Sequence, residues 1–93
     1  MEITFDEAKR QRTLEERGLD FAQAGEIFSG AEFTLPDDRN DYGEERYNTF
    51  GLLNGRLVAV VWTIRNDTRR IISMRKANER EKARYQQALD RPG

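Results

Sequence analysis

The most chemically suggestive stretch of the sequence is the basic segment 69–85, in which seven of seventeen residues are Arg or Lys. The pattern of this segment is that of a β-strand followed directly by an amphipathic helix. Guanidinium groups on rigid elements form forked hydrogen bonds that suit phosphate groups. The segment therefore predicts a surface for a phosphate-bearing ligand, with the rest of the chain as its support.

The charge of the chain is divided between its two halves. Residues 1–55 carry six Lys or Arg against thirteen Asp or Glu, a net charge of −7, whereas residues 56–93 carry ten against four, a net charge of +6. The acidic half would repel a long duplex nucleic acid wherever it came near. The division therefore favours one basic face that binds an anionic ligand or an acidic partner.

The 93 residues include neither Cys nor His. Disulfide frameworks, zinc sites built on Cys or His, and catalytic dyads that use either residue are therefore excluded. We expect no cofactor and no metal, so an acid or base must be a carboxylate, a Tyr, a Lys or an Arg-assisted group. The length predicts a single domain over residues 1–93. Because no signal peptide and no membrane-spanning apolar run is present, we expect a cytoplasmic protein with no membrane partner.

The elements that must position the basic segment follow from caps, periodicity and turns. A surface helix is expected over residues 7–17 after an Asp6 cap, and a second helix with a core face is expected between Asp20 and Gly30. A final helix should run from 78 to about 89. Strands are expected at 31–35, 46–53, 57–64 and 70–74, with an Asn54-Gly55 hairpin turn between the second and the third. The predicted fold class is α+β, with two N-terminal helices, a four-stranded antiparallel sheet and a C-terminal helix.

Several short motifs occur in unbroken order along almost the whole chain. They are Arg17-Gly18-Leu19-Asp20-Phe21 with Ala24 and Phe28, Gly43-Glu44-Glu45-Arg46, Gly51, Val60-Val61-Trp62-Thr63-Ile64-Arg65, Arg70-Ile71-Ile72-Ser73-Met74-Arg75 with Ala77, and Glu81 with Tyr85. In this order the motifs resemble the BrnT family of bacterial type II toxins. The stretch from Arg70 to Ala77 is the most specific part of the resemblance.

The resemblance implies a compact RelE-like ribonuclease fold and cleavage of RNA that inhibits translation. It also implies neutralisation by a co-encoded BrnA-like antitoxin, a ribbon-helix-helix protein that contacts operator DNA and represses the shared promoter together with the toxin. We predict that the antitoxin buries apolar and basic surface near the final helix, in a heterotetramer around an antitoxin dimer.

Two positions depart from the usual family pattern. Many members have Lys-His-Gly where this chain has Glu16-Arg17-Gly18, and a His where it has Trp62. The alternative function is therefore a catalytically weak or inactive homologue, which acts as an antitoxin-binding corepressor or an RNA-binding module.

RNA cleavage without a metal requires a base for the ribose 2′-OH, charge stabilisation on the phosphorane and protonation of the leaving 5′-oxygen. Arg65, Arg70 and Arg75 on the last two strands are the candidates for charge stabilisation. Arg65 and Arg75 should fall at opposite ends of an antiparallel pair, so Arg65 and Arg70, which are close across the turn, are the better phosphate clamp. The candidate general base is Glu45 or its neighbour Glu44.

The remaining candidates each have a structural alternative. Tyr85 is the candidate proton donor or stacking residue, with half-buried packing as its alternative. For Glu45 and Arg46, the structural alternative is a surface ion pair. Trp62 is either a core residue or a platform for a base, depending on which face of its strand it occupies. The residues expected to contact RNA are Arg46, Trp62, Thr63, Arg69 and Lys76.

Overall fold

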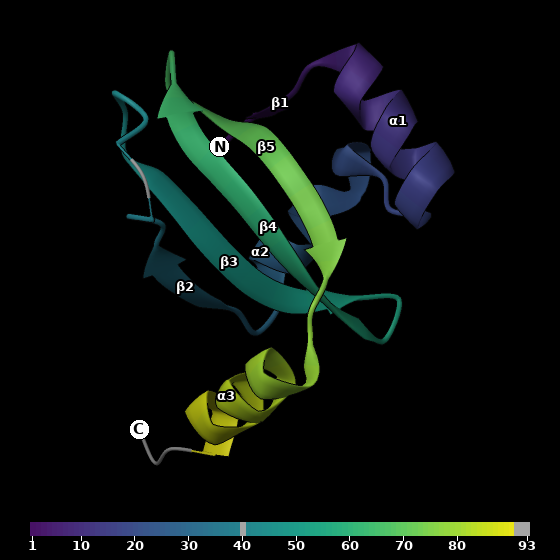
Figure 1. Ribbon diagram of the computed structural model, residues 1–93, viewed down its shortest axis with the longest axis vertical. Coiled ribbons are helices and arrows are strands. Elements are labelled where there is room, and N and C mark those ends of the chain that lie inside the picture. Colours follow the sequence, from purple (N-terminus) through teal and green to yellow (C-terminus); the bar gives the residue numbers. More distant parts are fainter. Residues whose placement is uncertain (40, 91–93) are drawn as a thin grey trace.

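A five-stranded mixed sheet forms the centre of the computed structural model, which describes residues 1–39 and 41–90 (Figure 1). The strand order is β1-β5-β4-β3-β2. The strands are β1 (Ile3–Thr4), β2 (Phe33–Pro36), β3 (Arg46–Leu53), β4 (Arg56–Arg65) and β5 (Thr68–Lys76). The meander from β2 to β5 is antiparallel, whereas β1 pairs with β5 in parallel.

The prediction of four antiparallel strands is wrong in one respect, because β1 adds a fifth strand in parallel. Ile3 and Thr4 lie opposite Arg69 and Arg70 of β5. A strand of two residues carries almost no periodicity, and its pairing depends on where β5, more than sixty residues later, begins. The four strands expected from the pattern are present in the expected antiparallel order.

The helices are α1 (Glu7–Arg17), α2 (Ala24–Ser29) and α3 (Glu79–Asp90), with a 3₁₀ turn η1 (Phe21–Gln23) before α2. The predicted second helix is therefore shorter than expected. Its cap, Asp20, accepts a hydrogen bond from the backbone N–H of Ala22, only two residues ahead, which favours a tight 3₁₀ turn. Within the described residues, no helix is long and apolar enough to cross a membrane.

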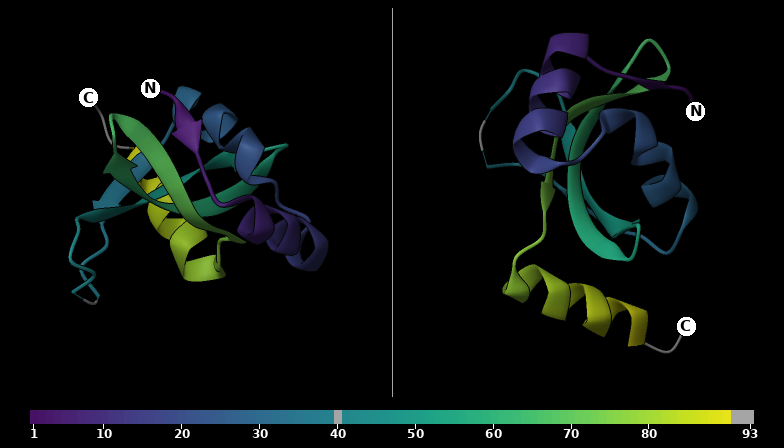
Figure 2. Two further views of the ribbon diagram at one scale, coloured as in Figure 1. Left: turned by 90° about the horizontal axis from the view of Figure 1, so that it is seen from above. Right: turned by 90° about the vertical axis from the view of Figure 1, so that its right-hand side faces the viewer.

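The main core lies on the face of the sheet that packs against η1 and α2. Phe21, Ile27, Val60 and Met74 are fully buried there. A smaller core, which includes Phe50, Leu57, Ala77 and Tyr85, lies on the opposite face at the end covered by α3. Figures 1 and 2 show α3 standing apart from α1 and α2, where β5 ends. We call this second side of the sheet the open face.

A β-bulge in β5 decides which arginines reach the open face. Val61 of β4 is paired with Ser73 and Trp62 with Ile71, which leaves Ile72 without a partner. Because side chains alternate along a strand, Arg70 and Arg75 would point to opposite faces without this extra residue. With it, both belong to the open face.

Candidate functional site

Three arginines from three neighbouring strands lie on one end of the open face, away from α3. Arg46 of β3 and Arg70 of β5 both lie opposite Thr63 of β4, and Arg65 is two residues further along β4 on the same face. We call Arg46, Arg65 and Arg70 the arginine cluster. Thr63 lies between them, 2% exposed, and donates its hydroxyl to the carbonyl of Glu45 at 2.6 Å. The structure therefore brings the expected pair Arg65 and Arg70 to one place.

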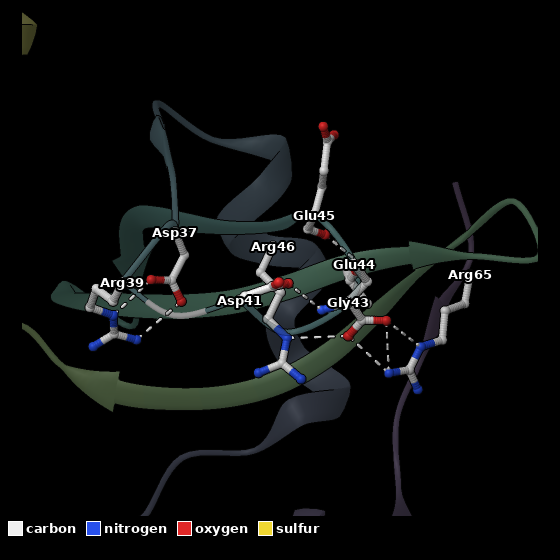
Figure 3. Close-up of polar contacts among 9 residues, drawn as sticks. Asp37, Arg39, Asp41, Gly43, Glu44, Glu45, Arg46 and Arg65 are labelled. Carbon is white, nitrogen blue, oxygen red and sulfur yellow. Dashed lines mark hydrogen bonds and ion pairs between the residues drawn. The ribbon is translucent and has the colours of Figure 1, made fainter.

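The carboxylate of Glu44 lies between Arg46 and Arg65 of this cluster (Figure 3). It accepts hydrogen bonds from Arg65 Nε at 3.2 Å and Arg65 Nη2 at 3.0 Å, and from Arg46 Nε at 3.2 Å. The hydrogen bonds from Arg65, and next those from Arg46, hold the pKa of Glu44 below its ordinary value although burial opposes them. Arg46 is also stacked on Tyr42, with 3.9 Å from the guanidinium carbon to the ring centroid. Glu44 thus neutralises part of the positive charge of Arg46 and Arg65.

The neighbouring carboxylate, Glu45, lies on the other side of the strand. Its side chain points away from the arginine cluster (Figure 3) and accepts a hydrogen bond from the Tyr47 hydroxyl at 3.0 Å. Tyr47 in turn is tilted against the Trp62 ring at 4.8 Å. Both residues precede β3, and their directions are set by the bend at residues 43 and 44. Of the two candidate bases, Glu44 is the one that lies beside Arg46 and Arg65.

Two of the expected RNA contacts lie on the core face. Trp62 is 8% exposed, donates its indole N–H to Thr49 Oγ1 at 2.8 Å and packs edge-on against Phe28. The guanidinium of Arg69 lies 4.1 Å from the Phe28 ring centroid and 5.0 Å from that of Trp62. Trp62 is therefore a core residue, and neither it nor Arg69 lies on the open face. Lys76, which pairs with Val58 at the end of β5, is exposed but also outside the arginine cluster.

Arg75 and Tyr85 attach α3 to the sheet. Arg75 forms a bidentate ion pair with Glu81, with both contacts at 2.7 Å, which raises the pKa of Arg75 and lowers that of Glu81. Tyr85 is 5% exposed and donates its hydroxyl to the carbonyl of Ala31 at 2.7 Å.

Arg75 lies far from Arg65 on the sheet. It pairs with Ala59, which is six residues along β4 from Arg65, so about 20 Å separates the two arginines at roughly 3.3 Å per residue. The expectation that Arg65 and Arg75 lie at opposite ends is confirmed.

A cavity of about 330 Å³ lies beside α3 on the open face. Its lining includes Phe33, Asn48, Phe50, Arg39, Arg75 and Arg84. Sequence reasoning missed Asn48, Arg39 and Arg84 as site residues. Asn48 could have been noticed in the sequence, because it is an amide inside a strand of otherwise β-prone residues. Arg84 gave no such signal, because it has the spacing of an ordinary solvated helix face.

Comparison with known families gives a match over most of the chain. A family model described as ribonuclease toxin, BrnT, of type II toxin-antitoxin system matches residues 5–81 of the chain. No curated protein matches it. The matched range contains α1, α2, all but the first residues of the sheet and the start of α3, so it includes the whole arginine cluster.

Proposed function

Because the chain belongs to the BrnT family of ribonuclease toxins of type II toxin-antitoxin systems, we propose that it cleaves RNA at the arginine cluster and thereby inhibits translation. The observation that carries the proposal is the convergence of Arg46, Arg65 and Arg70 on one end of the open face. Arg46 and Arg65 bind the carboxylate of Glu44, and Arg70 lies near the carboxylate of Asp6. Arginine forks of this kind bind the nonbridging oxygens of a phosphodiester.

The proposed reaction needs neither His nor a metal. The phosphodiester takes the place of the Glu44 carboxylate against Arg46 and Arg65, and the guanidinium groups stabilise the charge that develops on the phosphorane. Glu44, displaced but still adjacent, accepts the proton of the 2′-OH as this oxygen attacks phosphorus. The bond to the 5′-oxygen then breaks, which leaves a 2′,3′-cyclic phosphate and a 5′-OH. Water protonates the leaving oxygen, since the hydroxyl of Tyr85 is engaged by Ala31.

A type II toxin-antitoxin family implies an antitoxin as partner. We propose that this partner is a BrnA-like ribbon-helix-helix protein, that the two form a heterotetramer, and that the complex represses its own promoter. The apolar groove between α3 and the β3–β4 hairpin supports docking near the final helix. Leu52 and Leu89 are 50% and 46% exposed there, beside Arg56 and Lys82.

One observation favours the alternative, a weak or inactive homologue that acts mainly as antitoxin-binding corepressor. The arginines lower the pKa of Glu44, and a carboxylate with a lowered pKa is a weak base. Under this alternative the arginine cluster would still bind RNA, but the bound RNA would stay intact.

Induction of the isolated gene tests both functions. We expect growth arrest and RNA cleavage from the wild-type chain, and neither from an Arg65→Ala, Arg70→Ala double variant. Arg75 is left intact because it binds Glu81 of α3 and lies outside the arginine cluster. Arg80→Ala, on the exposed surface of α3, is the matched control for the loss of an arginine and should behave as wild type. Normal growth with abundant folded wild-type protein and intact RNA would favour the corepressor.

A further inference from the structure

The cavity beside α3 has an apolar floor and a polar rim, and we propose that it binds one base of the RNA that crosses the open face. The inference rests on the proposed function for the identity of the polymer, but binding of a single nucleotide there does not require cleavage. The volume of about 330 Å³ is at the lower end of the range for small-molecule pockets, roughly 300–1,000 Å³. A base fits this space, whereas a base-paired duplex does not.

The floor of the cavity provides stacking surfaces. Phe33 of β2 and Phe50 of β3 are cross-strand partners, with ring centroids 6.3 Å apart and ring planes inclined by 33°. The guanidinium carbon of Arg84 on α3 lies 5.8 Å from the Phe33 ring centroid. Unpaired bases are bound in proteins by stacking on aromatic rings and on guanidinium planes. Phe33 and Arg84 supply both kinds of surface, and Phe50, which is 6% exposed, packs beside Phe33.

The charges of the lining balance. Its charged members are Arg39, Arg75, Arg84, Asp37, Asp38 and Glu81. Three cations and three carboxylates give a formal charge of zero, and two of the arginines are already paired with carboxylates at 2.7 Å. A lining with balanced charges suits an uncharged base better than a phosphate.

Asn48 supplies the hydrogen-bonding edge. Its side-chain oxygen is buried without a hydrogen-bond partner, and a buried carbonyl in this state is costly until a donor is supplied. Rotation about the terminal side-chain torsion exchanges the amide oxygen and nitrogen, so either can face the cavity. An amide forms paired hydrogen bonds with the edge of a base, and such pairs discriminate between bases. Asn48 is thus the residue that selects the base.

The wall of the cavity is held in place before any ligand arrives. Glu81 binds Arg75 through both oxygens and also accepts the backbone N–H of Asn78 at 2.9 Å, which fixes the first turn of α3. Tyr85 fixes the next turn through Ala31. A preformed pocket loses less conformational entropy on binding than a mobile one.

The test is an NMR titration of the purified chain with AMP, CMP, GMP and UMP, with ribose 5-phosphate as the control that lacks a base. We expect the nucleotides to shift the side-chain resonances of Asn48, Phe33 and Phe50, and ribose 5-phosphate to leave them unmoved. The dissociation constants of the best and the worst nucleotide should differ by about fivefold or more if one amide pair reads the base.

Variants separate selection from stacking. Asn48→Leu should bring the four dissociation constants within about twofold of one another, and Arg84→Ala should weaken all four by about fivefold or more. Arg80→Ala, on the same helix but outside the lining of the cavity, should change none of them. Thermal unfolding of each variant identifies any loss of the fold.

Three results would overturn the proposal. Equal shifts from ribose 5-phosphate would make the cavity a phosphate site. Unmoved cavity resonances at saturating nucleotide would place the base elsewhere, and resonances that move only when the antitoxin is added would assign the cavity to a protein partner. Intact RNA in a cleavage assay, combined with nucleotide-dependent shifts at the cavity, would reject the proposed function and support the base pocket.

Discussion

Replacing Glu44 by Gln separates the two effects that this carboxylate should have on RNA. The change keeps the shape of the side chain but removes the negative charge that holds Arg46 and Arg65. Because the side chains of Glu44 and Arg65 are 25% and 46% exposed, solvent screens their attraction, and removal of the charge should have a modest effect on affinity.

RNA binding by Glu44→Gln should therefore be tighter than that of the wild-type chain by roughly two- to fivefold. Cleavage should fall at the same time by about 100-fold or more, since a general base contributes roughly 10²–10⁴-fold to the rate. The lowered pKa of Glu44 keeps the wild-type carboxylate ionised from pH 5 to 8, so the difference in affinity should be constant over that range. Opposite signs for affinity and rate are the signature of the proposed role.

The assay measures affinity by fluorescence anisotropy with a fully 2′-O-methylated RNA, which cannot be cleaved, and measures rate by single-turnover cleavage of the unmodified RNA. Glu45→Gln is the matched control, because it removes the same charge one residue away from a side chain that points away from the arginines. Both of its constants should stay within about twofold of wild type.

Three results would refute the reasoning. Equal gains in affinity from Glu44→Gln and Glu45→Gln would mean that only net charge matters. Weaker RNA binding by Glu44→Gln would mean that the carboxylate organises the arginines instead of competing with RNA. An unchanged cleavage rate in Glu44→Gln would remove this residue as the base.

Two further predictions concern the support of the site. Gly51→Ala should destabilise the fold by about 1–3 kcal/mol, because the new Cβ would meet Ile27 Cγ2 at 2.6 Å; an unchanged melting temperature would contradict this contact. Glu81→Gln should lower the free energy of unfolding by about 1 kcal/mol at pH 7, because the ion pair with Arg75 is lost and the cap on the Asn78 N–H is weakened. The pKa of Glu81 is lowered by folding, so its stabilisation is present above the unfolded pKa near 4.5 and is lost as pH falls through the folded value. In denaturant unfolding, the difference in free energy of unfolding between the wild-type chain and Glu81→Gln should shrink in acid. A difference that grows in acid would contradict this prediction.

Much of the fold is encoded locally and could be read from the sequence. The Asn54-Gly55 turn has both residues at positive φ, 53° and 77°, as a two-residue hairpin requires. Asp6 and Gly18 cap α1 as expected. β4 is buried along most of its length, as its continuous apolar run indicated. Each of these features depends on a few adjacent residues, which is why the pattern was sufficient.

The arrangement of the site depends on features that no local pattern encodes. The bulge at Ile72 places Arg70 and Arg75 on one face, and strand alternation alone would have placed them on opposite faces. The direction of Glu44, away from that of Glu45, depends on how the loop enters β3. The open cavity beside α3 depends on the docking of that helix through Arg75 and Tyr85. Long-range packing therefore decided which of the candidate residues meet.

Cleavage of a defined RNA by the purified chain, with a chelator present, tests the central claim most directly. The wild-type chain should produce fragments with 2′,3′-cyclic phosphate and 5′-OH ends, and an Arg65→Ala, Arg70→Ala double variant that melts at the wild-type temperature should be slower by at least about 100-fold. Wild-type cleavage by the double variant, or intact RNA with folded wild-type protein, would contradict catalysis at the arginine cluster.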